Sequence, residues 1–193
     1  FEKPEPFVPR YLRREVTGRV GYKGEVITPQ SEEDSAQAVA YLKKEQVEAI
    51  AVCYINSYAN EAHERRTVEK IKELWPEVYV CPSVDITKEW REYERTSTAV
   101  LNAYVMPVAS SYINRLGQRL TEAGIAGNRY IMQSNGGTTT FDQANITPIN
   151  VVASGPVAAV FGASILGNLI GEPNLIPFYG GGSQATGALL APS

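Results

Sequence analysis

Three turns that contain glycine are the segments of this sequence whose residue types and spacing could bind a ligand. Each follows an apolar run that we expect to be a strand, and ligands of α/β proteins collect beyond the carboxyl ends of such strands. The turns are Ser134-Asn135-Gly136-Gly137, Ser154-Gly155-Pro156 and Gly180-Gly181-Gly182-Ser183. A tight connection between two elements explains any one of them. Three such turns within 50 residues, with almost no charge between them, favour a shared ligand cleft.

The second and third turns have the chemistry of an anion site. Pro156 is expected as the first helical residue, with Ser154 and Gly155 ahead of it, so that backbone N–H groups stay free at the helix end. Free N–H groups and the helix dipole favour a bound anion. In the third turn, the glycines would let the backbone approach a phosphate closely.

The third turn lacks the acidic residues of a nucleotide loop. A loop that handles a nucleotide usually carries an acid that holds the metal or orients the water. Residues 179–186 (YGGGSQAT) contain none. The only aspartates of the chain, Asp34, Asp85 and Asp142, do not cluster in the sequence. The pattern predicts a phosphate cradle with no recognisable metal site.

The cysteines and the single histidine indicate no catalytic role. Cys53 and Cys81 both lie in apolar runs, where a thiol acts as a small hydrophobic group. His63 is expected to be a solvated or capping residue near the start of a helix. The segment 91–98 (REYERTST) leaves two alternatives open. It is either a helix start with charged pairs four residues apart, or a polar interdomain hinge or substrate-facing patch.

Alternating strands and helices must position these turns, which indicates an α/β fold with a mostly parallel sheet. A capping pattern at Ser31 begins one helix, and Pro107 should kink or divide the longest one. The apolar side of that helix includes Tyr104, Val108 and Ile113. We expect a hairpin over 8–29, strands over 47–55, 77–86, 129–137, 149–153 and on both sides of the loop within 174–190, and helices over 31–46, 60–76, 91–124 and 154–171.

The composition is that of an ordinary globular protein, and it limits the classes of partner that we expect. The net charge of −3 argues against nucleic acid, no apolar run is long enough to span a membrane, and the two separate thiols fit the cytoplasm. Residues 130–193 contain no Lys or Arg and only two acids, Asp142 and Glu172. We therefore expect a fragment whose last third belongs in a larger core, formed with the remainder of its own chain. By itself it should self-associate.

Four segments resemble the hydantoinase A/5-oxoprolinase family, which includes ATP-dependent N-methylhydantoinase and acetone carboxylase subunits. The segments are VEAIAVCYINSYANEAHERR (47–66), REYERTSTAVLNAYVMPV (91–108), IMQSNGG (131–137) and VVASGPVAAVFGA (151–163), and they occur in the family's order. The resemblance covers residues 5–178 and implies an actin-like ATPase (ribonuclease H-like) fold. Residues 1–90 would end its first domain, and residues 91–193 would supply the linking helix and begin the second.

The resemblance also implies a function for the complete protein: ATP-dependent hydrolysis of a cyclic amide such as a hydantoin or 5-oxoproline. ATP and Mg²⁺ would bind between the domains of the full-length protein, with neither expected in the fragment, and a hydantoinase B-type subunit would be a partner. Cofactor contacts are expected from Ser154, Gly155, Gly181, Gly182 and Ser183. Substrate contacts are expected from Ser134, Asn135, Gly136 and Gly137.

Two departures from the family pattern leave alternatives open. The family's first phosphate loop, Asp-x-Gly-Gly-Thr, is absent here, and in the second loop Tyr179 replaces the first acid and Thr186 the last. The missing acids favour a non-catalytic assembly subunit with a degenerate phosphate loop. An acetone-carboxylase type of subunit is the alternative among enzymes.

Overall fold

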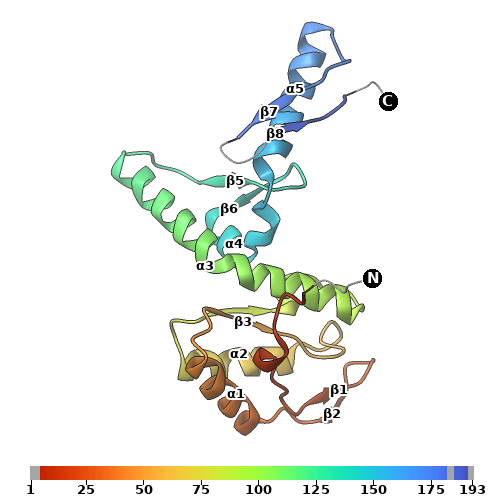
Figure 1. Cartoon of the computed structure of the whole chain (residues 1–193), viewed down its shortest axis with the longest axis vertical. Helices are drawn as coiled ribbons and strands as arrows, with labels where there is room; N and C mark the ends of the chain where they lie inside the picture. Colours follow the sequence, from red (N-terminus) through yellow and green to blue (C-terminus); the bar gives the residue numbers. More distant parts are fainter. Residues whose placement is uncertain (1–4, 182–184, 191–193) are drawn as a thin grey trace. The chain divides into compact units, whose positions relative to one another are not determined.

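The computed structural model describes residues 5–181 and 185–190 of the chain (Figure 1). Its contacts divide the chain into two compact units, Phe1–Tyr112 and Ile113–Ser193, which we call the N-terminal and the C-terminal unit. The assignment of residues 1–90 and 91–193 to two domains of a complete protein stays a prediction.

A parallel pair of strands forms the centre of the N-terminal unit. Strand β3 (Ala49–Val52) pairs with β4 (Tyr79–Pro82), with Ala49 opposite Tyr79. Parallel neighbours need a crossover connection, and helix α2 (Ala62–Leu74) supplies it. These elements confirm the strands expected within 47–55 and 77–86 and the helix expected within 60–76.

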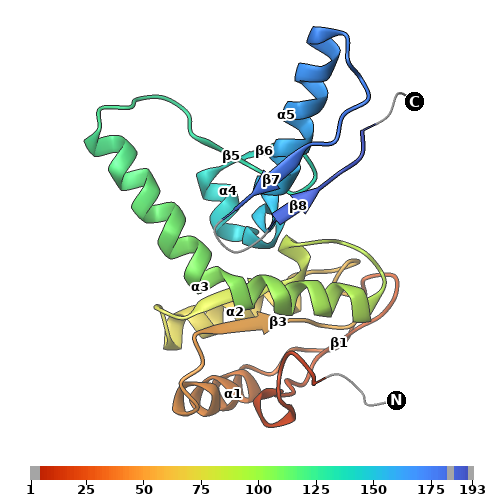
Figure 2. The ribbon, with the colours of Figure 1, turned by 45° about the horizontal axis from the view of Figure 1, so that its top comes forward.

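Helices cover both faces of this pair, and together they form three layers (Figures 1 and 2). On one face, Ile50 and Val52 pack in a cluster with residues of α1 (Glu32–Lys44) and α2. On the other face, Cys81 packs against residues of α3 (Glu92–Glu122). A strand that is buried on both faces is expected to be apolar throughout. This explains why β3 lies within a continuous apolar run of the sequence.

Helix α1 begins where the capping pattern predicts. The Ser31 hydroxyl accepts a hydrogen bond from the backbone N–H of Asp34 at 3.1 Å. Acidic residues occupy the first turn, and Lys43 and Lys44 occupy the last turn. Acidic residues at the N-terminus and basic residues at the C-terminus both interact favourably with the helix dipole.

The hairpin expected over 8–29 is shorter than predicted. Strand β1 (Arg19–Val20) pairs with β2 (Val26–Thr28) in antiparallel orientation. The segment before β1 instead contains a short 3-10 helix, Arg10–Leu12. Another 3-10 helix, Ser83–Asp85, follows β4 directly and ends the apolar run there.

Helix α3 is one helix of 31 residues, and Pro107 does not divide it. Ile113 is buried as predicted, but the rest of the buried face of α3 differs from the predicted one. Tyr104 and Val108 are exposed, whereas Ala99 and Ala103 are buried against the sheet. Small side chains let the helix backbone lie close to the strands, so the larger apolar residues turn outward in this unit.

The C-terminal unit begins with a hairpin and a short helix. Strand β5 (Tyr130–Met132) pairs with β6 (Thr138–Thr140) in antiparallel orientation. Helix α4 (Phe141–Ile146) follows directly. The Thr140 hydroxyl caps it by accepting a hydrogen bond from the N–H of Gln143.

A long apolar helix and a second hairpin complete the unit. Helix α5 (Ser154–Ile170) contains no charged residue. Strands β7 (Phe178–Gly180) and β8 (Ala185–Gly187) form an antiparallel hairpin beside its N-terminal half (Figures 1 and 2). This hairpin confirms the expected order of strand, loop and strand within 174–190.

Two sequence-based expectations about strands are wrong. Residues 149–153 form no strand, because Pro148–Val151 is a 3-10 helix. Its Asn150 carbonyl accepts hydrogen bonds from Ser134 and pairs with no strand. The sheet is also not mostly parallel: among the described residues, only β3 and β4 pair in parallel, and the other three pairs are antiparallel hairpins.

Candidate functional site

The predicted anion site begins at the N-terminus of α5, where Ser154 and Gly155 are the first two helical residues. Pro156 is the third helical residue, so the prediction that it is the first is wrong. The N-cap residue is Ala153, which has a left-handed backbone (φ 62°, ψ 18°) and no side-chain oxygen. The first N–H groups of α5 are therefore not capped by the usual Ser, Thr, Asp or Asn side chain.

The β7–β8 hairpin reaches this helix end through Tyr179. A Cβ atom added to Gly155 would lie 2.9 Å from the Tyr179 hydroxyl oxygen. Gly180 ends β7, and Gly181 follows it. The structure thus brings the second turn together with the start of the third. Gly182 and Ser183 lie outside the described residues.

The first turn, residues 134–137, lies against the same helix. Gly136 has a φ of +86°, and a Cβ atom there would overlap the ring of Phe161 in α5. The Ser134 hydroxyl donates to the Asn150 carbonyl at 2.6 Å, and the Gly137 N–H donates to the Asn135 side chain at 2.9 Å. This turn is therefore closed by its own hydrogen bonds and tied to the segment that leads into α5.

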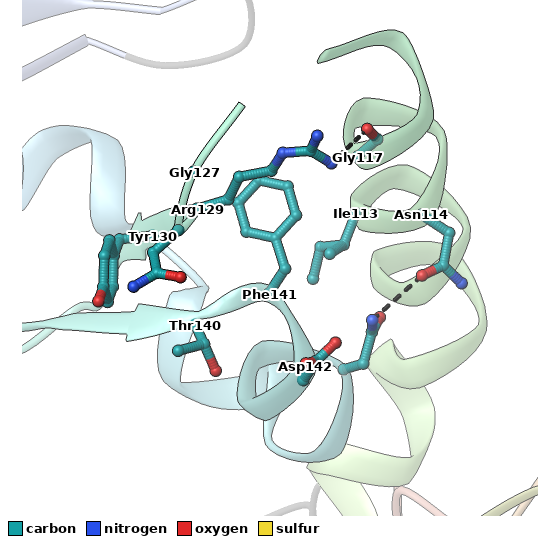
Figure 3. A pocket seen from close by; sticks show the side chains of 11 residues that line it. Ile113, Asn114, Gly117, Gly127, Arg129, Tyr130, Thr140, Phe141 and Asp142 are labelled. Carbon is teal, nitrogen blue, oxygen red and sulfur yellow. Dashed lines mark hydrogen bonds between the residues drawn. The ribbon is translucent and has the colours of Figure 1, made fainter. Parts of the chain in front are cut away.

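A separate groove of about 490 Å³ lies between the end of α3, β5 and α4 (Figure 3). Arg129 donates to the Gly117 carbonyl at 2.6 Å and to the Thr121 hydroxyl at 2.7 Å. Asn145 donates to the side chain of Asn114 at 3.1 Å. None of the residues predicted to bind a ligand lines this groove. Its polar side chains hold the end of α3 against α4 and β5.

A buried ionic network in the N-terminal unit was missed by the sequence analysis. Glu64 and Arg95 are both fully buried, and Ser83 lies between them. The Ser83 hydroxyl donates to the Glu64 carboxylate at 2.7 Å and accepts from Arg95 Nε at 3.1 Å. Buried charges are normally paired or fully hydrogen-bonded, and this network satisfies that requirement.

The network connects the segment that follows β3, the 3-10 helix that follows β4, and helices α2 and α3. Glu64 also accepts hydrogen bonds from the N–H groups of Tyr54 and Val84. Arg95 also donates to the carbonyls of Tyr54, at 2.7 Å, and Glu89, at 2.6 Å. These buried charged side chains thus hold the end of the sheet to two helices.

The segment 91–98 is a helix start, as the first alternative states, but its ion pair joins residues three apart and not four. Helix α3 begins at Glu92, and Arg91 forms an exposed ion pair with Glu94 at 3.6 Å. Arg95 does not take part in such a pair, because its guanidinium group is buried in the network. No sequence signal separates Arg91 from Arg95 except the helical spacing that turns Arg95 toward the sheet with Ala99.

His63 is buried, so the prediction of a solvated or capping residue is wrong. Its ring lies edge-on to Tyr54 with centroids 5.6 Å apart, and burial lowers its pKa, aided by the charge of Arg66. The thiols behave as predicted. Burial raises the pKa of Cys53 to about 12 and that of Cys81 to about 11, so neither is a reactive thiolate.

Comparison with known proteins decides the family. A sequence model of hydantoinase/oxoprolinase matches residues 95–186, and a model of the hydantoinase/oxoprolinase N-terminal region matches residues 1–75. The chain belongs to the hydantoinase/oxoprolinase family. Caprolactamase subunit alpha of Pseudomonas jessenii is 34% identical over 177 residues, which cover 92% of this chain and 25% of that protein.

Solved structures of this family support the α/β fold. Nucleotide-free acetone carboxylase matches with a TM-score of 0.86 and 27% identity, and the ATP-dependent caprolactamase of Pseudomonas jessenii matches with 0.81 and 32%. Each match covers 98% of this chain and 27% of the other. The chain therefore spans about a quarter of the length of the family members it matches.

The β7–β8 hairpin pairs the two residues that depart from the family's acidic pattern. Tyr179 and Thr186, which the resemblance aligns with the acids of the family's second loop, lie directly opposite each other across the hairpin. Two carboxylates there would be neighbours on one face of the strands.

Among the described residues, no group of three or more His, Cys, Asp or Glu side chains could hold a metal ion. In the described part of the chain, no helix has the length and apolar character needed to cross a membrane.

Proposed function

We propose that this chain is part of a hydantoinase/oxoprolinase-type subunit that, in the complete protein, hydrolyses a cyclic amide with ATP. The observation that carries this proposal is the similarity to an ATP-dependent caprolactamase, which extends over 98% of this chain in the structure comparison. The enzyme class is the hydrolase class, with a hydantoin or 5-oxoproline as the substrate. We place the protein in the cytoplasm.

A second candidate is an acetone-carboxylase type of subunit. Acetone carboxylase has the higher TM-score of the two solved structures, 0.86 against 0.81. The shared fold thus fits both chemistries. A third candidate, a non-catalytic assembly subunit, is favoured by the uncharged residues Tyr179 and Thr186 at the acidic positions of the family pattern.

The residues present fit the phosphates of ATP better than they fit Mg²⁺. We assign phosphate contacts to the backbone at the start of α5, Ser154 and Gly155, and to Gly181, Gly182 and Ser183 of the hairpin loop. The turn Ser134-Asn135-Gly136-Gly137, tied to the segment before α5, would face the substrate. Magnesium prefers carboxylate and phosphate oxygens, and the hairpin offers no carboxylate. Carboxylates for a metal would have to come from other parts of an actin-like ATPase.

Partner subunits are part of the proposal. The caprolactamase relative is a subunit named alpha, which supports an assembly of several chains. We propose a hydantoinase B-type subunit as the partner of the complete protein. The remainder of the same polypeptide would cover the exposed apolar side chains of α5.

The full-length protein, purified with its partner subunit, distinguishes the candidates. Phosphate release from ATP would be measured with hydantoin, 5-oxoproline, or acetone together with bicarbonate, and the organic products would be identified. Hydrolysis of a cyclic amide coupled to ATP supports the first proposal. A carboxylated product supports the second. A complex that assembles only when this subunit is present, but that has no turnover with either the wild-type subunit or Tyr179→Asp, supports the third.

The 193-residue chain alone is expected to hydrolyse neither ATP nor hydantoins. It lacks the family's first phosphate loop and the acids of the second. The measurement is phosphate release and ring opening by the purified chain, compared with a buffer blank. Turnover above the blank that disappears in a Gly181→Val variant would contradict this prediction.

The 193-residue chain is also expected to self-associate through α5. This helix has five large apolar side chains that are about half exposed or more: Phe161, Ile165, Leu166, Leu169 and Ile170. A helix that is apolar on all sides is normally buried in a protein core. Sedimentation velocity over a range of concentrations should show dimers or larger species.

The matched variants for this measurement are Leu169→Glu and Ile27→Glu. Leu169 is on α5 and Ile27 is an exposed residue of β2 in the other unit. Leu169→Glu should shift the chain toward the monomer, whereas Ile27→Glu should not. A wild-type chain that stays monomeric at high concentration would disprove self-association.

A further inference from the structure

Helix α2 carries the only histidine of the chain, His63, which is 4% exposed. A Cβ atom added to Gly18 would lie 3.1 Å from Nδ1 of His63 and 3.2 Å from the ring of Tyr54. The backbone at Gly18, directly before β1, therefore lies against the imidazole, which also meets the Tyr54 ring edge-on. The ring of His63 is thus buried under the segment 17–30, which contains the β1–β2 hairpin.

Hydrogen bonds hold the start of this segment to its neighbours. The Thr17 N–H donates to the Asp34 carboxylate at 2.9 Å, and the Thr17 carbonyl accepts from the Ser31 N–H at 2.8 Å. Further along, the Val20 carbonyl accepts from the Asn56 side chain at 2.9 Å. Movement of the segment away from the imidazole would disturb these bonds, so the amides of Thr17 and Ser31 report on its attachment.

The site suits the neutral imidazole and not the charged one. Among the described residues, Nδ1 of His63 has no hydrogen-bond partner. Both ring nitrogens of the imidazolium carry a hydrogen. Protonation in place would therefore bury a charge together with a donor that has no acceptor, and both cost free energy.

The charged groups around the ring do not offset this cost. On α2, the Glu64 carboxylate is bound within the ionic network, and on α1 the Asp34 carboxylate is bound to a backbone N–H. Burial and then the positive charge of Arg66 lower the pKa of His63. Tyr54 stays a neutral phenol because burial raises its pKa. The charged side chains of the segment itself are exposed: Arg19, Lys23 and Glu25.

We propose that His63 makes the attachment of residues 17–30 to α2 depend on pH, with the neutral imidazole holding the segment and the imidazolium releasing it. In the released form the ring reaches water, where its pKa returns to the ordinary value of about 6.5. The released form therefore binds the proton more tightly than the attached form. Attachment is complete above about pH 6.5 and weakens as the pH falls below that value.

Hydrogen exchange in the 193-residue chain tests this, because histidine is the only side chain that ordinarily changes its charge between about pH 5 and 8, and the chain contains one. The protection factors of the Thr17 and Ser31 amides should be up to about tenfold lower at pH 5.5 than at pH 7.5. The NMR signals of His63 should titrate below about pH 6.5, and the amides of the β3–β4 pair should keep their protection.

Three results would overturn the proposal. The first is unchanged protection at Thr17 and Ser31, and the second is a His63 signal that titrates at the ordinary pH or above it. The third is an equal loss of protection in β3 and β4, which would mean that the whole unit unfolds.

Two variants separate the position of the histidine from its presence. His63→Phe keeps a ring beside Tyr54 but cannot be protonated, so protection at Thr17 should not fall at pH 5.5. His63→Phe combined with Glu69→His moves the histidine to an exposed position of the same helix and should behave in the same way. A loss in either variant as large as in the wild type would contradict the proposal. The wild-type titration decides the matter even if His63→Phe does not fold.

Discussion

Replacement of Arg95 by Met is expected to lower the free energy of unfolding of the N-terminal unit by about 3–5 kcal/mol, the usual cost of removing one partner from a buried charge network. Met retains the aliphatic stem of Arg95 but none of its donors. The Ser83 hydroxyl and the carbonyls of Tyr54 and Glu89 would lose their bonds to it. The buried carboxylate of Glu64 would lose the nearby positive charge.

Arg91→Met is the matched control for Arg95→Met. Arg91 lies one helical turn earlier and is exposed; it forms an ion pair with Glu94 at 3.6 Å and lies 5.5 Å from the centroid of the Trp90 ring. Exposed pairs contribute about 0–1 kcal/mol, so urea unfolding of Arg91→Met should resemble that of the wild type. Equal stability of the Arg95 and Arg91 variants would show that the network does not hold the unit together.

Replacement of Glu64 by Gln is expected to cost about 2–3 kcal/mol, because a buried donor is left without an acceptor. The carboxylate accepts from the Ser83 hydroxyl and from the N–H groups of Tyr54 and Val84. Gln replaces one accepting oxygen by an NH₂ group, which can only donate. An NH₂ group would therefore face an N–H group inside the core.

Glu69→Gln is the control on the same helix, because Glu69 is exposed. It should change the unfolding midpoint in urea by little. The double variant Glu64→Gln with Arg95→Met should be less destabilised than the sum of the two single variants, since both act on one network through Ser83. A purely additive double variant would mean that the two charges are stabilised separately.

Local patterns predicted several elements well. The Ser31 pattern located the start of α1, and the continuous apolar run at 47–55 located β3. Such features depend on neighbours in the sequence or on the burial of both strand faces, so they are visible in the residues themselves. The run Ile149–Val151 has the same β-branched character, but a strand needs a partner, and the hydrogen bonds of Asn150 go to Ser134 instead.

The candidate site was predictable only in part. Glycine spacing indicated three turns, and the structure shows that all of them, as far as they are described, lie along α5. The contact of Tyr179 with Gly155 joins residues 24 positions apart and has no sequence signal. In the sequence, Tyr179 stood out only because it replaces an acid of the family pattern, and nothing there indicated that it contacts a helix.

The sequence by itself indicated the family, the α/β class and most of the longer strands and helices, because ordered motifs and apolar periodicity are properties of neighbouring residues. Only the tertiary structure decided which charges are buried. Glu64 and Arg95 look like other residues of charged helices until β3 and the 3-10 helix at Ser83–Asp85 bring Tyr54, Ser83 and Val84 to them. A buried charge is tolerated only where distant segments supply its hydrogen bonds, and sequence spacing does not record that proximity.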